Sequence, residues 1–491
     1  MLKALRYIIL LFSVCMFFIG VIFNNPNVIL TAICSLLIHN LWYSTESFSD
    51  RIIFFAFNIT FFTFLVARLV IKTITNYKDI YNDNKFGLDF NNDLIIWNIF
   101  IVLFISLLFL YIGYSLLKSN NKIRPNKFKG MISGLSINSI AFTSKFLFYF
   151  TFIFNVLVLL DQARFTSQAG YTELYSSYSS SYPYFVDKLA EMCPAALFMY
   201  LATFPNKRKS FIPLMLYLLL GTLSLAVGNR NIFVLNILIV IIYLCLRNFT
   251  DKSEKWFGKK EVFICIGAIP FLIILLNAVS YFRQDSTMTT NSFIDIICDF
   301  FYKQGVSVNL IGYAQSLASQ LPDMSIYTFG RLTDFLRNNI ITQSLFDLPK
   351  YTSQTIESAL YGNSFADSVS YILSPNRYIN GWGYGSSYVA ELFKDFGYIG
   401  VGIGNFMLGI ILALMSKLFR INVICAWISL TMTRLLLYAP RDTATSFIVS
   451  TFSLINMLTI VIIILGSILL EGKKVKSSNL VIHNAKTSSN N

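Results

Sequence analysis

Charged side chains are scarce in this sequence of 491 residues, and their scarcity excludes an ordinary water-soluble protein. Asp, Glu, Lys and Arg make up 13% of the chain, about half of the roughly 25% that soluble domains carry. Hydrophobic residues reach 55%, and the 47 Phe are spread over the whole length, so no polar half remains to form a soluble enzyme. The composition therefore predicts an all-α polytopic membrane protein.

Cysteine and histidine are too few and too scattered for several kinds of site. The seven cysteines stand singly, without a Cys-x-x-Cys pair, so neither a disulfide framework nor a zinc site is indicated. The two histidines are His39, in an apolar run, and His483, in the polar tail. Histidine-based catalysis on the expected outer face is therefore excluded, and no paired carboxylates stand there at metal-ligand spacing. We expect neither a bound metal nor another cofactor.

Long apolar runs are plentiful. Because a bilayer core needs about 20 apolar residues per helix, these runs predict about twelve membrane spans and one large outer loop that contains short helices. The predicted divisions are residues 1–281 (nine spans), 282–387 (the large loop), 388–472 (three spans) and 473–491 (a polar tail). The spans lie near residues 5–23, 28–45, 51–72, 94–117, 138–161, 187–204, 211–227, 231–247, 261–281, 388–416, 421–438 and 444–470. The first is interpreted as an uncleaved signal anchor.

Basic residues set the expected orientation. Lys and Arg gather in short clusters between alternate spans, among them residues 118–129, 207–209 and 473–476. The positive-inside rule assigns such clusters to the cytoplasm. Both termini are then cytoplasmic, and the large loop lies on the outer, periplasmic face. The formal net charge of +14 thus follows from membrane topology, and no nucleic-acid partner is expected.

Arginine stands at the outer mouths of three spans, where the positive-inside rule should deplete it. Arg230 lies in the short turn between the seventh and eighth spans, Arg283 follows the ninth, and Arg441 lies between the last two. A guanidinium group stays charged, and its planar fork binds phosphate oxygens in pairs. Three such groups at one depth predict a metal-free pyrophosphate clamp. The alternative is that each arginine snorkels or pairs with Asp285 or Asp442.

A glycine- and serine-rich segment, residues 381–387, leads into a helix that carries Glu391. Glycines let backbone N–H groups converge, and a helix N-terminus favours an anion. Glu391 is therefore a candidate to hold or deprotonate a substrate hydroxyl. The alternative is a tight re-entry turn with a glutamate that complements the helix dipole.

Two further segments are ambiguous. Residues 303–307, Lys-Gln-Gly-Val-Ser, interrupt an amphipathic stretch of the large loop, either as part of a site or as a polar break between two surface helices. The tyrosine-rich run at 171–184 either stacks sugars on its aromatic faces or forms an aromatic belt at the membrane interface. Of these two interpretations of the run, the belt is favoured.

The order of these motifs resembles that of the Wzy-type O-antigen polysaccharide polymerases. The matching features, in chain order, are Gly228-Asn-Arg230, Arg283, Gln304-Gly305-x-Ser307, the segment 381–387 with Glu391 and Asp395-Phe-Gly397, and Pro440-Arg441-Asp442. The resemblance covers about residues 225–445, and elsewhere it rests on a general plan of twelve spans in a GT-C-like bundle. O-antigen ligases have similar hydropathy but typically use an outer-loop histidine, which this chain lacks.

The resemblance implies a glycosyltransferase that joins polyprenyl-pyrophosphate-linked oligosaccharide repeats at the outer face of the bacterial inner membrane. Polyprenyl pyrophosphate is the leaving group. The implied partners are undecaprenyl-pyrophosphate-linked oligosaccharides, the lipid bilayer, and a flippase and a chain-length regulator of the same pathway. The expected catalytic residues are Arg230, Arg283, Arg441 and Glu391. The expected substrate-binding residues are Gln304, Gly305, Ser307, Arg377, Gly383, Gly385, Ser386 and Asp442.

A lipid-linked oligosaccharide flippase or other transporter, and an O-antigen ligase-like transferase, are the alternative functions. Transporters usually combine internal repeats with sites near the bilayer midplane. The hydropathy of this sequence shows no internal repeat, and its candidate residues gather at one face. Both features favour the polymerase.

Overall fold

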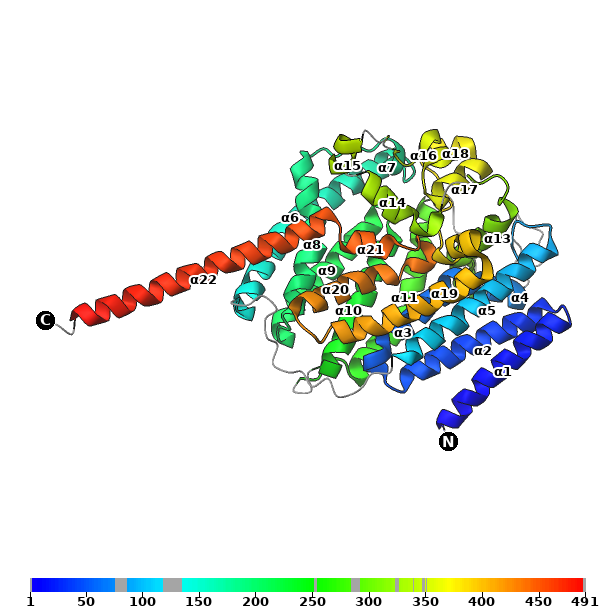
Figure 1. Ribbon diagram of the computed structural model, residues 1–491, viewed down its shortest axis with the longest axis horizontal. Coiled ribbons are helices and arrows are strands. Elements are labelled where there is room, and N and C mark those ends of the chain that lie inside the picture. The colour runs from blue at the N-terminus through cyan, green and yellow to red at the C-terminus, as the bar shows by residue number, and fades with distance from the viewer. Residues whose placement is uncertain are drawn as a thin grey trace.

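The computed structural model describes residues 2–75, 86–117, 135–250, 254–283, 292–322, 326–338, 340–346, 349 and 351–488. Within these ranges the regular elements are all helices, which confirms the predicted all-α fold. Figure 1 shows the long helices packed side by side into one bundle, from which the C-terminal helix projects.

Ten helices in the described part of the chain are long and apolar enough to cross a membrane. The third combines three consecutive elements, α3, η1 and α4, and the tenth includes α21. The elements are α1 (Leu2–Ile22), α2 (Pro26–Thr45), α3 (Phe48–Phe61), η1 (Phe62–Val66), α4 (Ala67–Thr75), α5 (Asp93–Leu116), α6 (Ile137–Ala169), α9 (Lys207–Ala226), α10 (Arg230–Thr250), α11 (Lys259–Arg283), α19 (Tyr388–Leu418), α21 (Ser446–Thr451) and α22 (Leu454–Ser488).

The other two predicted spans are also helices, but each departs from a plain membrane span. The helix α8 (Tyr184–Ala202) carries charged residues in its first turns, and α20 (Val423–Leu436) has 14 residues. Both contribute to the core, where the indole Nε1 of Trp427 on α20 donates to the carbonyl oxygen of Ala195 on α8 (3.1 Å). Because α8 and α20 pack against other helices, they do not need the apolar length of a lipid-facing span.

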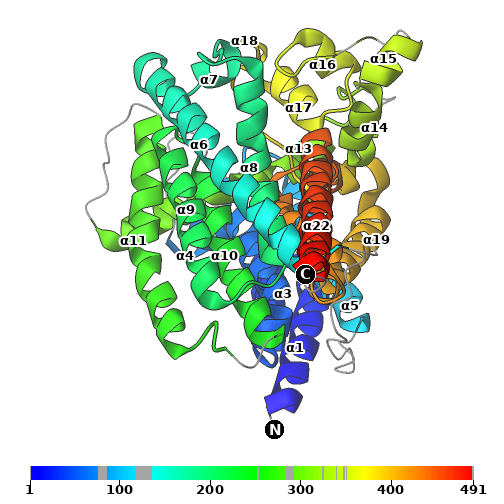
Figure 2. The same cartoon turned by 90° about the vertical axis from the view of Figure 1, so that its left-hand side faces the viewer.

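Short helices gather at one end of the bundle, opposite the N-terminus (Figures 1 and 2). Most belong to the predicted large loop between α11 and α19, which does contain short helices. They are α7 (Glu173–Ser176), α12 (Phe293–Gln304), η2 (Gly305–Val308), α13 (Asn309–Ser316), η3 (Tyr327–Phe329), α14 (Gly330–Arg337), α15 (Ile340–Phe346), α16 (Ile356–Tyr361), α17 (Phe365–Leu373), α18 (Pro375–Ile379) and, between α20 and α21, η4 (Ala439–Arg441). The turn between α9 and α10, which contains Gly228-Asn-Arg230, and the start of α19, which carries Glu391, both lie at this end. We therefore call it the motif end of the bundle.

Glycine allows α5 and α19 to pack backbone to backbone. An added Cβ at Gly113 on α5 would collide with the carbonyl oxygen of Phe406, and one at Gly409 on α19 would collide with that of Leu110. Small residues permit such close approach between membrane helices. The contact anchors α19, which carries Glu391, against the core.

Two of the long helices are interrupted close to the motif end. In α19 the backbone of Gly397 adopts φ +60° and ψ −153°, a conformation that glycine takes most readily. This break separates the first turns of α19 from its long apolar part. Between α3 and α4 the chain forms the π-helix η1, which packs against η2 and η4. Single π-turns occur frequently at functional sites.

Candidate functional site

Glu391 joins two of the predicted motifs. Its side chain is 0% exposed. One carboxylate oxygen accepts from the hydroxyl of Ser386 (2.6 Å), and the other accepts from the backbone N–H of Ala444 (2.7 Å). Ser386 belongs to the glycine-serine segment, and Ala444 follows Pro440-Arg441-Asp442. A single buried carboxylate thus holds together two segments that lie more than 50 residues apart in the chain.

The glycine-serine segment descends from the surface to this carboxylate. Gly383 and Gly385 are exposed, whereas Ser386 and Ser387 are buried. The backbone φ of +77° at Gly385 lies in the region that favours glycine. The N–H of the intervening Tyr384 donates to the hydroxyl of Ser370 on α17 (3.0 Å). The short helices of the large loop therefore support the outer part of the segment.

Arg377, a predicted substrate-binding residue, lies apart from Glu391 on the surface helix α18. It is exposed, and its guanidinium carbon lies 5.9 Å from the ring centroid of Trp382. The exposed edge of the glycine-serine segment thus combines a cation with an aromatic ring.

Arg441 connects the Pro-Arg-Asp turn to a third motif. Its Nη1 donates to the backbone carbonyl oxygen of Gln304 (3.5 Å), and its guanidinium carbon lies 5.9 Å from the ring centroid of Phe64 in η1. The turn, the segment at 304–307 and the π-helix therefore meet at Arg441, as the packing of η1 against η2 and η4 indicates.

Asp442 is half-buried beside this contact, and one of its carboxylate oxygens accepts from the N–H of Thr443 (2.8 Å). Burial raises the pKa of Asp442, while the Thr443 N–H, the Ser446 hydroxyl and the charge of Arg331 oppose the rise. The net shift is upward. Asp442 therefore retains a proton at a higher pH than an exposed aspartate does.

Gly305 lies directly on the backbone of Arg68, a buried arginine that the sequence interpretation did not assign to the site. A Cβ added at Gly305 would lie 2.6 Å from both the N and the Cβ of Arg68. Arg68 is 6% exposed, its Nε donates to the carbonyl oxygen of Gly87 (2.7 Å), and its guanidinium lies 4.1 Å from the Tyr302 ring. Ser307 is also buried, and within the described residues its hydroxyl has no hydrogen-bond partner. The signal for Arg68 was a charge inside an apolar run.

Arg230 begins α10 and reaches the neighbouring helix α11. Its Nη1 donates to the carbonyl oxygen of Leu276 (3.2 Å). Arg283 is the last residue of α11, and its side chain lies outside the described residues. The first of the three predicted arginines therefore contacts the helix that ends at the second.

A contact between α10 and α20 places Arg230 and Arg441 at the same end of the bundle. The Nε and Nη2 of Arg434 on α20 donate to the Oδ1 of Asn236 on α10 (3.4 and 3.3 Å). From this contact α10 runs back to Arg230 over roughly 9 Å, at 1.5 Å per residue, and α20 runs in the same direction toward Arg441. Arg434 is a second charge within an apolar helix that the sequence interpretation did not assign to the site.

The tyrosine-rich run contacts two of the motifs. The hydroxyls of Tyr171 and Tyr175 both donate to the Oδ1 of Asn229, in the Gly-Asn-Arg turn (3.4 and 3.3 Å). A Cβ added at Gly381 would lie 2.9 Å from the carbonyl oxygen of Thr172. The run therefore lies between the turn at 228–230 and the glycine-serine segment, which neither the belt nor the sugar-stacking interpretation specified.

Acidic residues near Glu391 do not form a metal site in the described part of the chain. The charges of Asp442 and Asp395 act on Glu391, and the Asp395 carboxylate accepts from the N–H of Thr328 (2.6 Å). No group of three or more His, Cys, Asp or Glu side chains that could hold a metal ion occurs among the described residues. Metal independence itself stays a prediction.

The motif end thus connects Gln304, Arg441, Glu391 and Ser386 through successive contacts, although they come from three distant parts of the sequence. A family model for the O-antigen polysaccharide polymerase Wzy matches residues 5–474, nearly the whole chain. The chain belongs to this family. A Wzy polymerase is a glycosyltransferase-type enzyme that acts on lipid-linked oligosaccharide repeat units in a membrane. Comparisons with curated proteins and with solved structures found no match, so the likeness to a GT-C bundle rests on the resemblance alone.

Proposed function

We propose that this Wzy polymerase transfers a growing oligosaccharide from polyprenyl pyrophosphate to the next lipid-linked repeat at the outer face of the bacterial inner membrane. The observation that carries the proposal is the contact network at the motif end, in which Glu391 holds the glycine-serine segment to the Pro-Arg-Asp turn and Arg441 reaches Gln304. The network combines fixed positive charge with carboxylates. The reaction needs both.

The arginines serve the leaving group. A bond forms between the acceptor hydroxyl oxygen and the anomeric carbon, and the bond from that carbon to the pyrophosphate oxygen breaks, so negative charge develops on the pyrophosphate. Guanidinium groups fixed where that charge appears stabilise the transition state more than the bound substrate. We assign this role to Arg230, Arg283 and Arg441, of which Arg230 and Arg441 lie at the same end of the bundle.

The carboxylates serve the acceptor hydroxyl. Glu391 is fully buried, and both of its oxygens already accept hydrogen bonds, which supports the role of positioning the segment that receives the hydroxyl. Asp442 is the second carboxylate of the network, only half-buried, with a raised pKa. An acid whose pKa is shifted toward neutrality is suited to accept the hydroxyl proton. We therefore place Asp442 beside Glu391 as a candidate base.

The remaining predicted residues lie around this network. Arg377 with Trp382, and the exposed Gly383 and Gly385, offer a cationic, aromatic and backbone surface for the sugars of the acceptor. The half-buried Gln304 lies beside Arg441, where we place the sugar nearest the pyrophosphate. The buried Gly305 and Ser307 support this place from η2, which packs against η1 and α4.

The test is a reconstitution of the purified full-length protein in proteoliposomes with a synthetic polyprenyl-pyrophosphate-linked repeat. We expect a ladder of lengthened oligosaccharides and release of polyprenyl pyrophosphate, in excess chelator as well as without it. A ladder that vanishes in chelator and returns with Mg²⁺ would assign the pyrophosphate to a metal instead.

The alternatives give different products in the same assay. A flippase moves the lipid-linked repeat between leaflets without making a glycosidic bond. A ligase-like transferase moves sugar to a separate acceptor and forms no ladder. Either outcome would overturn the proposal.

A further inference from the structure

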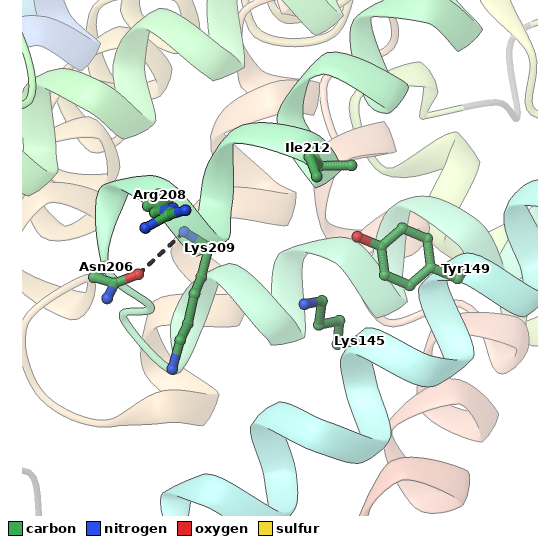
Figure 3. A pocket seen from close by; sticks show the side chains of 6 residues that line it. All are labelled: Lys145, Tyr149, Asn206, Arg208, Lys209 and Ile212. Atoms are coloured by element: carbon green, nitrogen blue, oxygen red, sulfur yellow. Dashed lines mark hydrogen bonds between the residues drawn. The ribbon is translucent and has the colours of Figure 1, made fainter.

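The end of the bundle opposite the motif end carries a positively charged pocket that the proposed reaction does not use. Figure 3 shows its lining, which comes from two helices. Lys145 and Tyr149 lie on α6, and Asn206, Arg208, Lys209 and Ile212 lie at the start of α9. The cavity has a volume of about 470 Å³. Because α9 has 20 residues, the pocket lies roughly 30 Å from the Gly-Asn-Arg turn at the other end of that helix.

No acidic side chain among the described residues balances the charge of this pocket. Three of the six lining residues are cations and none is acidic. Among the described residues none of the three forms an ion pair. The nearby acids are directed at Lys207 instead, whose backbone N–H donates to Glu254 (2.9 Å) and whose Nζ lies 3.4 Å from Glu261.

Tyrosine side chains connect the two helices, α6 and α9, that line the pocket. The Nζ of Lys145 lies 5.8 Å from the ring centroid of Tyr149 and 5.9 Å from that of Tyr200 on α8. The hydroxyl of Tyr200, which is 3% exposed, donates to the carbonyl oxygen of Lys209 (3.2 Å). The ammonium group of one helix is therefore fixed close to the first turn of the other.

The first turn of α9 is not itself the anion site. The side chain of Asn206 already accepts from the backbone N–H of Lys209 (3.1 Å), as Figure 3 shows. The attraction for an anion therefore comes from the side chains of Lys145, Arg208 and Lys209.

We propose that this pocket binds the phosphate of an anionic glycerophospholipid. Phe146 on α6 and Phe211 and Ile212 on α9 are 64%, 61% and 58% exposed, so apolar surface for acyl chains adjoins the cationic pocket. A soluble phosphate has no apolar part that could cover that surface. Basic pockets between membrane helices are suited to anionic headgroups, and an ammonium group at the depth of Lys145 is costly without such a partner. In the orientation proposed above, the lipid belongs to the cytoplasmic leaflet.

The test measures lipid binding to the purified full-length protein by native mass spectrometry, with phosphatidylglycerol and, for comparison, zwitterionic phosphatidylcholine. We expect preferential retention of phosphatidylglycerol by the wild type and a loss of about tenfold or more in its affinity in the triple variant K145Q/R208Q/K209Q. The matched control is K255Q/K259Q/K260Q, which removes three exposed lysines near the same end of the bundle and should keep the preference. Polymerisation is measured separately, so the two proposals succeed or fail independently.

Four results would overturn the proposal. These are equal binding of the two lipids, unchanged binding in the triple variant, an equal loss in the control, or complete displacement of the lipid by millimolar inorganic phosphate, which would assign the pocket to a soluble anion. Should the triple variant fail to fold, R208Q and K209Q are measured singly. The side chains of Arg208 and Lys209 are both exposed, and each single substitution should weaken the binding of phosphatidylglycerol but not of phosphatidylcholine.

Discussion

A guanidinium group carries five N–H donors, and one backbone carbonyl engages only a fraction of them. Arg441 donates from Nη1 to Gln304, an uncharged acceptor, so its positive charge is not neutralised by this contact. An arginine held in place by a neutral partner is prepared to meet an anion without first breaking an ion pair. In this respect an arginine that binds pyrophosphate differs from an arginine that forms a structural salt bridge.

Replacement of Arg230, Arg283 or Arg441 by Ala should lower turnover by roughly 10²-fold, the scale of losing one oxyanion donor. Lys keeps the charge but lacks the planar fork, so it should restore activity only in part. The readout is the oligosaccharide ladder at equal protein level in the membrane. Arg164, exposed on α6, is the control and should tolerate Ala. Wild-type ladders from all three Ala variants would refute the clamp.

Replacement of Glu391 by Ala should reduce stability as well as activity. It leaves the buried hydroxyl of Ser386 and the N–H of the half-buried Ala444 without their acceptor, and an unsatisfied buried polar group costs about 1–3 kcal/mol. S386A removes one of the two hydrogen bonds and should lie between E391A and the wild type. Thermal unfolding in detergent checks this. An E391A variant that unfolds like the wild type would contradict the role of Glu391 in holding the two segments together.

The raised pKa of Asp442 predicts an acid limb in the pH profile. The ionised carboxylate accepts the proton, so activity should fall as the pH drops through this raised pKa, above the range of an exposed aspartate. The stability contribution has the opposite sign, because the folded state favours neutral Asp442 and loses this advantage as the pH rises. Initial rates in proteoliposomes from pH 4 to 9 test this. D442N should lose most activity, and its residual rate should lack that limb.

The motifs themselves could be predicted from the sequence, but their contacts could not. A charged residue or a glycine pattern is visible in the chain, whereas the hydrogen bond from Ala444 to Glu391 depends on how α19 and α20 pack. Arg68 and Arg434 were visible as charges within apolar runs, yet they were not assigned to the site. Their significance comes from Gly305 and Asn236, which only the folded bundle brings to them.

Between η2 and α4, Gly305 is the position where an added methyl group should be most destabilising. An added Cβ would lie 2.6 Å from the backbone N of Arg68, so η2 and the start of α4 would have to move apart. Overpacking of this kind costs about 1–3 kcal/mol. G305A should therefore unfold earlier in a thermal scan and polymerise poorly. At Gly267 on α11 a Cβ would meet nothing within 4 Å, and G267A should match the wild type.

Helix positions followed from the sequence because the length of an apolar run is a strong constraint in a membrane. Each of the twelve predicted spans coincides with one helix or with consecutive helical elements, and ten helices of the described chain are long and apolar enough to cross a membrane. The exceptions to the plain pattern are α8 and α20, whose surroundings are protein, and the π-helix η1. Neither feature can be derived from hydropathy, because both depend on which elements pack against the helix.

The distribution of basic clusters along the chain predicts which end of the bundle faces the cytoplasm. Cysteines introduced at Ser176 and Asn380, both exposed at the motif end, should react with a membrane-impermeant thiol reagent in intact cells whose outer membrane has been made permeable. Cysteines at Lys255 and Lys259, exposed near the opposite end, should react only after lysis. Labelling in the reverse pattern would invert the orientation and place the proposed site in the cytoplasm.

The hydrogen bond between Ala444 and Glu391 also has a consequence for biosynthesis. Glu391 leaves the ribosome more than 50 residues before Ala444, and its carboxylate is fully buried in the finished protein. During translation the Glu391 carboxylate therefore lacks one of its two hydrogen-bond donors until α20 and the turn that follows it have entered the bundle. The proposed site is thus closed by one of the last segments to be made. A chain that ends at residue 443 contains every motif, including Pro440-Arg441-Asp442, but lacks the Ala444 N–H that donates to Glu391.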